Sequence, residues 1–201
     1  MMSEEAAVTR SHSNRWICSA AILSFFACAA AMADRKPILE QETLHSVPGS
    51  FSQMWQMAGV VAKVRIANSE VRALPSPAGA LPRINTIHHA TVIRAFKGDV
   101  RSGASISFAQ VAGQLDVGEA IIRVMDEEPL PKGDYIVFLQ TSPKDTQLRL
   151  IGDVDGAYKV HDGYIEPQGR FTAFAQQHRG LSERRFVDEI EAVAAKSPKV
   201  R

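Results

Sequence analysis

The sequence has little of several residue types that identify common protein classes. Its 201 residues include only two cysteines, aromatic residues make up 7%, and 23 basic residues nearly balance 22 acidic ones. Two cysteines are too few for a disulfide scaffold or a cysteine-rich zinc module. A net charge of +1 argues against a basic nucleic-acid binder, and 45% hydrophobic residues argue against a disordered chain. The composition indicates one globular domain, with room for a small appendage.

Sequence motifs for nucleotide binding and for serine hydrolases are also missing. The chain contains no Gly-x-Gly-x-x-Gly, no P-loop and no Gly-x-Ser-x-Gly. We therefore assign no catalytic, cofactor-binding or metal residues from the sequence, and we expect no cofactor.

Only one long apolar run is present, WICSAAILSFFACAAAMA at residues 16–33. Arg10 and Arg15 precede it, and it ends on small residues, which is typical of a secretory signal peptide. We expect cleavage before Asp34 and a periplasmic or extracellular location. An uncleaved membrane anchor and lipid attachment at Cys28 are the two alternatives. If residues 16–33 are not cleaved off, we expect them to be the only part of the chain that contacts a membrane.

Cleavage at this position changes the cysteine count but not the charge. Cys18 and Cys28 both lie in residues 1–33, which also hold two arginines and two glutamates. Residues 34–201 therefore contain no cysteine and keep a net charge of +1. A chain without disulfides depends on packing for its stability.

The pattern after residue 33 predicts an extended lead (34–49), a β-barrel domain (50–175) and a C-terminal helix with a tail (176–201). Ser50 is predicted to cap a short helix, and Ser182 an amphipathic one. Period-two alternation or apolar runs predict strands at 60–66, 85–96, 105–111, 120–125, 135–139, 158–161 and 164–167. Prolines in residues 68–83 predict a loop there, and residues 112–118 are also predicted to be a loop.

Asp162-Gly163 lies between the last two predicted strands. Asp-Gly favours a two-residue hairpin turn, in which both residues need positive φ. Strands separated by turns, with helices only near the ends, predict a mostly β fold. We expect a small antiparallel barrel or sandwich.

Four segments, in this order, carry a family resemblance: VVAKV at 60–64, TVIRAFKG at 91–98, GDYIVFL at 133–139 and GAYKV at 156–160. The set resembles exported bacterial domains of the netrin-like type, whose barrel is shared with tissue inhibitors of metalloproteinases. The resemblance covers roughly residues 55–167 and implies an OB-like barrel. Those inhibitors bind the protease zinc through an N-terminal cysteine. Here the expected N-terminus is Asp34 rather than a cysteine. The resemblance therefore implies the barrel but not the zinc-binding mechanism of the inhibitors.

His88-His89 is the first pair to test as a metal site. Neighbouring strand residues point to opposite faces, so two imidazoles there do not converge easily on one ion. Zinc would also need further ligands close in space. We expect one inward and one outward polar residue.

Two acidic segments also merit attention. Asp153-Val154-Asp155-Gly156 begins like a calcium loop, but its glycine comes fourth rather than sixth, so a turn is the preferred interpretation. Asp126-Glu127-Glu128 precedes Pro129 and is interpreted as a solvated loop rather than an acid–base pair.

The leading hypothesis is an exported, non-enzymatic β-barrel that binds a protein or glycan of the cell envelope. Loops on a rigid scaffold are common binding surfaces. Nucleic acid is not expected, because it calls for a basic groove and stacking aromatics. The competing hypothesis is an envelope hydrolase or metal-dependent enzyme whose site is assembled from residues distant in sequence. A structural envelope component held by an uncleaved segment 16–33 is the third.

Overall fold

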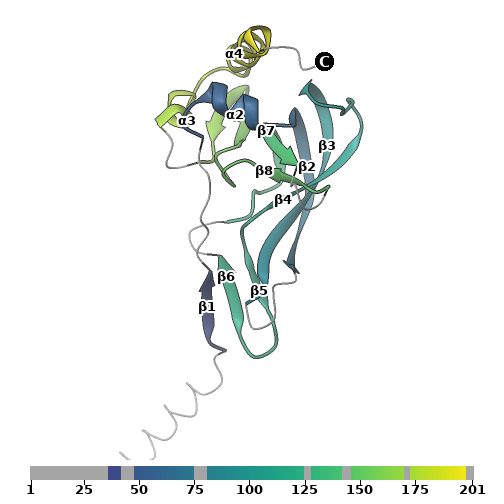
Figure 1. The fold of residues 1–201 in the computed structure, drawn as a ribbon, viewed down its shortest axis with the longest axis vertical. Coiled ribbons are helices and arrows are strands. Elements are labelled where there is room, and N and C mark those ends of the chain that lie inside the picture. Colours follow the sequence, from purple (N-terminus) through teal and green to yellow (C-terminus); the bar gives the residue numbers. More distant parts are fainter. Residues whose placement is uncertain are drawn as a thin grey trace, which may run out of the picture. The chain divides into compact units, whose positions relative to one another are not determined.

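The computed structural model describes residues 36–41, 48–74, 81–124, 128–141, 146–169 and 173–197. All described helices and strands lie within one compact unit, Ile38–Arg201. The elements labelled in Figure 1 are β1 (Ile38–Gln41), α2 (Phe51–Met57), β2 (Val60–Leu74), β3 (Arg83–Lys97), β4 (Ser105–Gln110), β5 (Gln114–Asp116), β6 (Ile121–Val124), β7 (Gly133–Thr141), β8 (Leu148–Leu150), β9 (Ala157–His161), β10 (Tyr164–Pro167), α3 (Ala173–Gln177) and α4 (Glu183–Lys196). The predicted signal segment, with Cys18 and Cys28, lies outside the described residues.

Five strands form a ring in the order β7, β2, β3, β4 and β8, and β8 pairs again with β7. All neighbours are antiparallel except β4 and β8, which run parallel. A five-stranded, partly open barrel is the OB-like architecture. Closure is partial here, because β8 contributes only three residues. The mostly β fold with an OB-like barrel, expected from the sequence, is confirmed.

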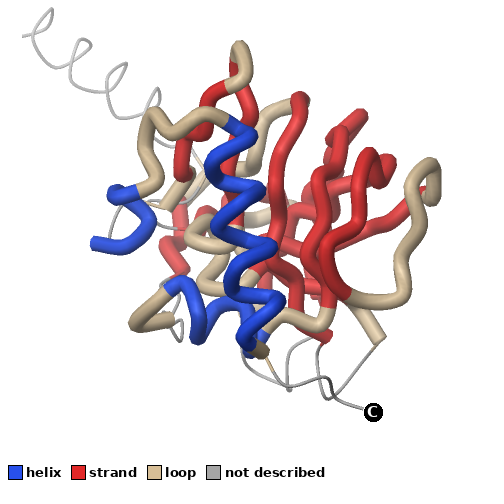
Figure 2. Tube along the Cα trace, turned by 90° about the horizontal axis from the view of Figure 1, so that it is seen from above, coloured by secondary structure: helices blue, strands red, loops and turns tan. Residues whose placement is uncertain are grey.

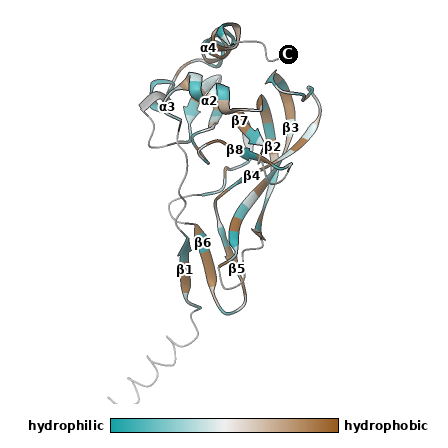
Figure 3. Cartoon of the chain, in the orientation of Figure 1, coloured by the Kyte–Doolittle hydropathy of each residue, from teal (hydrophilic) through white to brown (hydrophobic). Residues whose placement is uncertain are grey.

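Alternating side chains fill this ring. The inward residues of β2 are Val60, Ala62, Val64 and Ile66, and those of β7 are Tyr135, Val137 and Leu139. Lys63 and Arg65 point to the outer face and form ion pairs there. The hydropathy colouring in Figure 3 shows hydrophilic and hydrophobic segments interleaved along the strands. This alternation is what allows one sheet to bury one face.

Two helices cover part of the outer face of the sheet and create a second core. Trp55 of α2 and Phe186 of α4 are buried there with Phe138 and Tyr158. Figure 2 shows α4 lying over the strands. No helix in the described ranges combines the length and the apolar character needed to cross a membrane.

Both predicted helix caps are present. The Ser50 hydroxyl accepts the Gln53 N–H at 3.2 Å, and the Ser182 hydroxyl accepts the Arg185 N–H at 3.4 Å. These contacts satisfy backbone donors that an uncapped first turn leaves unpaired. The Asp162-Gly163 hairpin is also present, with φ of 51° and 78° at its two turn residues.

The predicted loop at residues 68–83 is wrong for residues 68–74 and for Arg83, which belong to strands. β2 continues to Leu74 and pairs with β3 as far as Arg83, and residues 75–80 lie outside the described residues. We call residues 68–74 of β2 and 83–89 of β3 the arm. Cross-strand pairing and the packing of Val71 near Ile84 outweigh the proline-rich composition.

The arm packs on a separate small sheet with the order β1, β6, β5. Ile122 and Val124 of β6 form a third core with Ile84 of β3. The strand β5 occupies part of the predicted loop at 112–118, and β1 lies inside the predicted extended lead. Both strands are too short for periodicity to distinguish them from loops.

A register shift reverses the predicted faces at one end of β3. The pairing between β2 and β3 is irregular on both sides of Lys63. In β3, after this irregularity, Ala95 packs against the barrel core whereas the Arg94 side chain is exposed. Uninterrupted alternation along β3 would place Arg94 on the same face as Val92. A bulge inserts one residue into a strand, so the alternation changes sign there.

Candidate functional sites

A row of polar side chains crosses the sheet where the barrel continues into the arm. It consists of Ser69, Thr86, His88 and Gln110, and we call it the polar seam. His88 is fully buried, with Nδ1 2.7 Å from Ser69 Oγ and Nε2 2.8 Å from Gln110 Oε1. Thr86 donates its hydroxyl to the Ala112 carbonyl at 2.9 Å. The seam therefore connects β2, β3 and β4 through side chains.

The contacts of Gln110 determine the tautomer of His88. Gln110 Oε1 accepts the Leu130 N–H at 3.0 Å, and its amide nitrogen donates to the Glu128 carbonyl at 2.9 Å. An amide oxygen only accepts, so His88 carries its proton on Nε2, and Nδ1 accepts from Ser69. Burial lowers the pKa of His88, and the hydrogen bond to Gln110 only partly opposes this. His88 is thus a neutral, structural histidine.

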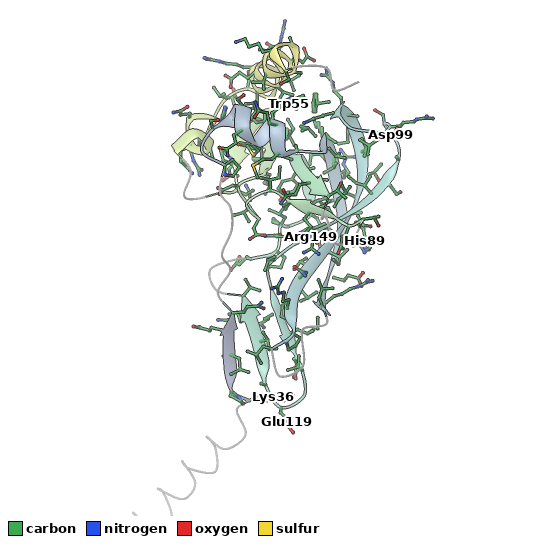
Figure 4. All side chains as sticks on the ribbon, viewed as in Figure 1. Lys36, Trp55, His89, Asp99, Glu119 and Arg149 are labelled. Atoms are coloured by element: carbon green, nitrogen blue, oxygen red, sulfur yellow. The ribbon has the colours of Figure 1, made fainter. Side chains whose placement is uncertain are left out.

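His89, labelled in Figure 4, is partly exposed whereas His88 is buried, which agrees with strand alternation placing the two side chains on opposite faces of β3. Its Nδ1 is 3.0 Å from Ser107 Oγ on β4, and its Nε2 is 3.1 Å from Glu70 Oε1 on β2. Three adjacent strands thus place a hydroxyl, an imidazole and a carboxylate in one hydrogen-bonded series. We call Ser107, His89 and Glu70 the surface relay.

The negative charge of Glu70 determines which nitrogen of His89 donates a hydrogen bond and which accepts one. His89 and Arg72 both bind its carboxylate, and together they hold the pKa of Glu70 below its usual value. An ionised carboxylate accepts the N–H at Nε2 of His89. Nδ1 is then free to accept the Ser107 hydroxyl proton. This arrangement lets the imidazole act as a base toward the hydroxyl.

A groove of about 610 Å³ runs along the N-terminal half of α4, and we call it the α4 groove. Its lining residues are Arg94 of β3, Gly163 of the β9–β10 turn, and Ser182, Glu183, Arg184, Val187, Asp188 and Glu191. The volume lies in the range of ordinary ligand sites, but the lining is mainly charged.

Two ion pairs join the walls of the α4 groove to the sheet. Lys63 Nζ lies 2.6 Å from Glu183 Oε1, and Arg94 Nη2 lies 2.6 Å from Glu191 Oε1. Lys63 and Arg94 are themselves cross-strand neighbours. The Arg94–Glu191 pair is exposed and contributes less than about 1 kcal/mol to stability. Its main effect is to orient charged groups at the edge of the groove.

Asp153 and Asp155, the calcium-loop candidates, are both buried in the turn at residues 151–156. Asp153 has φ of 54°, and its Oδ1 lies 3.4 Å from the Val111 N–H. The Asp155 carboxylate lies against Gly169, where a Cβ would come within 1.9 Å of Oδ1. These contacts connect the turn to neighbouring segments, consistent with its interpretation as a turn.

The remaining candidates are only partly described. Asp126 and Glu127 lie outside the described residues, and Glu128 supplies its carbonyl to Gln110. Ser182 is an N-cap at the end of the α4 groove. Across the described ranges, no three His, Cys, Asp or Glu side chains come together as a metal-binding group.

Sequence reasoning identified the histidines but missed most of their partners. Glu70 lies in the predicted loop, and Ser107 lies in a predicted strand without a predicted role. A signal for Ser107 was available, because antiparallel pairing of β3 with β4 places it opposite His89. His178 was also missed: it is buried against Phe186, with Nε2 3.1 Å from Glu189 Oε2.

Comparison with known proteins adds no assignment. No protein-family model matches this chain, and no curated protein matches it either. We therefore infer function from the geometry of the chain itself.

Proposed function

We propose that the chain is an exported β-barrel binding module whose partner, a protein or glycan of the cell envelope, docks in the α4 groove. The observation that carries this proposal is the groove itself, a concave surface of about 610 Å³ built from three separate segments. Concave surfaces on a rigid scaffold are the usual places for ligand binding.

Charges of both signs line the groove, which favours a polar partner without a large net charge. Arg94 and Arg184 provide donors, whereas Glu183, Asp188 and Glu191 provide acceptors. Nucleic acid is disfavoured, because the three carboxylates would repel its phosphates. We propose binding without chemistry at this groove, since its lining pairs no nucleophile with a base.

The export part of the proposal rests on residues 1–33 and on their resemblance to a signal peptide. Intact-mass measurement of the chain recovered from the cell envelope tests it. The expected species starts at Asp34 and carries no lipid. A species that retains residues 16–33, or that carries lipid on Cys28, would overturn cleavage at this site.

Neighbouring arginines on α4 provide a matched test of the docking site. Arg184 lines the groove, whereas Arg185 is exposed outside it and lies 3.9 Å from Glu189. Photo-cross-linking groups placed at each position are compared in envelope extract, together with the charge reversals Arg184→Glu and Arg185→Glu. We expect capture from position 184 only, and at least a tenfold loss of capture in Arg184→Glu alone. Equal behaviour of the two positions would overturn the groove as the docking site.

A further inference from the structure

We propose that the surface relay is an acyl-transfer site, in which Ser107 is the nucleophile, His89 is the general base and Glu70 positions the imidazole. The substrates are carboxylic esters. The distances of 3.0 Å from Ser107 Oγ to His89 Nδ1 and 3.1 Å from His89 Nε2 to Glu70 Oε1 are hydrogen-bonding distances at both steps. None of the three residues lines the α4 groove, so this site is independent of the proposed docking function.

The arrangement is that of a serine–histidine–acid triad, except that Nδ1 of the imidazole faces the serine and Nε2 faces the carboxylate. What the mechanism needs is one nitrogen that donates to a carboxylate and one that accepts from the serine. Glu70 is held ionised by its cationic neighbour Arg72, which keeps it able to accept. The order of the residues on three adjacent strands, β2, β3 and β4, holds the series in place.

The strand register also provides a donor for the developing oxyanion. Val92 N–H donates to the Ala104 carbonyl, and Gly103 N–H donates to the Val92 carbonyl, so hydrogen-bonded pairs alternate along β3 and β4 from this point. His89 and Ser107 consequently form a non-hydrogen-bonded pair. Ser107 N–H then points away from β3, toward the side of β4 on which β8 lies. A nucleophile's own N–H is a suitable oxyanion donor.

The chemical step balances with groups on this surface and water. Ser107 Oγ forms a bond to the ester carbonyl carbon while its proton moves to His89 Nδ1. The carbon–oxygen bond to the leaving alcohol then breaks, and the alcohol takes that proton from His89. In the second half, a water gives a proton to His89 and its oxygen to the acyl carbon. Ser107 leaves with the proton, and a carboxylic acid is released.

The exposed position of the relay determines the class of ester. The His89 and Glu70 side chains are each 42% exposed on the face of the sheet. Such a face admits acyl groups carried on extended or polymeric molecules, and it gives little selectivity among small esters. High exposure also leaves the reacting groups in water, so the expected rates are modest.

Serine variants on the same strand provide the first test. Ser107 and Ser105 both lie on β4, opposite His89 and Thr91 respectively. The full chain is treated with p-nitrophenyl acetate and analysed by intact mass and peptide mapping. We expect a single acetyl group on Ser107, which is lost in Ser107→Ala and retained in Ser105→Ala. Acetylation that is the same in both variants, or absent from Ser107 in the wild-type chain, would overturn the proposal.

Histidine variants separate general-base catalysis from ordinary imidazole reactivity. His161 is also exposed and also lies near a carboxylate, with Nε2 3.2 Å from Asp162 Oδ2. We expect His89→Gln to lower the acylation rate by about 100-fold and His161→Gln to leave it unchanged. Similar losses in both variants would show adventitious imidazole reactivity and overturn the assignment of His89.

Glu70→Gln tests the positioning role. We expect a lower acylation rate in Glu70→Gln, because the imidazole loses the carboxylate that orients it, and partial recovery of the rate in Glu70→Asp. The same loss in Glu70→Asp as in Glu70→Gln would reduce Glu70 to a structural role. Circular dichroism of every variant checks that the fold is kept. Loss of acylation with intact capture at the α4 groove separates this site from the docking function.

Discussion

The barrel with its helices and the arm with its small sheet are stabilised in different ways. The barrel buries continuous apolar layers on both sides of β2 and β7. The small core near the arm has only Ile84, Ile122 and Val124 fully buried among the described residues. The polar seam around His88 and Gln110 lies at the base of the arm, next to the barrel.

This difference assigns two roles to one pair of strands. Within the barrel, β2 and β3 are stabilised by burial of apolar area. This burial contributes much free energy but does not require a particular orientation of the groups in contact. In the arm, the same strands depend on hydrogen bonds with fixed partners. Buried hydrogen bonds add little when they form, but they are costly to leave unsatisfied. We therefore expect the seam to determine where the barrel ends and the arm begins.

The largest effect is expected from a cavity in the core between the sheet and the helices. Phe138 contacts Phe51 and Tyr158, with ring centroids 5.4 and 5.9 Å apart. Phe138→Ala should lower the free energy of unfolding by about 4 kcal/mol, whereas Ile122→Ala in the small core should cost about 2 kcal/mol. Urea denaturation followed by fluorescence and circular dichroism measures both. Equal losses would mean that the two regions share one core.

Gln110→Ala should have the next largest effect, because it disrupts the seam from its centre. The change leaves two buried groups without this partner, the His88 ring and the Leu130 N–H, and it also removes the donor to the partly exposed Glu128 carbonyl. We expect a loss of about 3 kcal/mol, with faster amide hydrogen exchange in the arm than in the barrel. Ser107→Ala, on the exposed face of the same strand, serves as the control. Uniformly faster exchange would contradict a local role for the seam.

A smaller effect is expected from pH, through His88. Its pKa in the folded chain lies below the ordinary value of 6.5, so the unfolded chain binds more protons as pH falls through 6.5. The free energy of unfolding should therefore decrease from pH 7.5 to 5.5. This decrease should be smaller in His88→Gln than in the wild-type chain, because that variant has no imidazole at position 88. The control His161→Gln should keep the wild-type slope; if His88→Gln keeps it too, the assignment of this effect to His88 is wrong.

The regular parts of the fold were accessible from the sequence because local pattern and tertiary contacts agree there. Ser50, Ser182 and the Asp162-Gly163 turn each have a local chemical reason for their conformation. The arm was not accessible, because residues 68–74 form a strand only through pairing with β3. The three-residue strand β8 was missed for the same reason, since it exists through its pairing with β4 and β7.

The candidate sites were less accessible than the fold. The alternation of His88 and His89 followed from strand geometry, but their partners did not. Ser69, Glu70, Ser107 and Gln110 reach the histidines across strands, so their placement depends on register. The α4 groove combines β3, a turn and α4, and no local pattern in the sequence connects these three segments.

The parallel pairing of β1 with β6 has a consequence for the order of folding. Ile38 pairs with Ile121, so the first described strand of the chain has its partner far along the sequence. During synthesis, β1 must wait unpaired until the hairpin of β5 and β6 has emerged. Such a distant contact closes a long loop and contributes late to folding. The first described strand is thus among the last to find its partner, and the small sheet remains two-stranded until then.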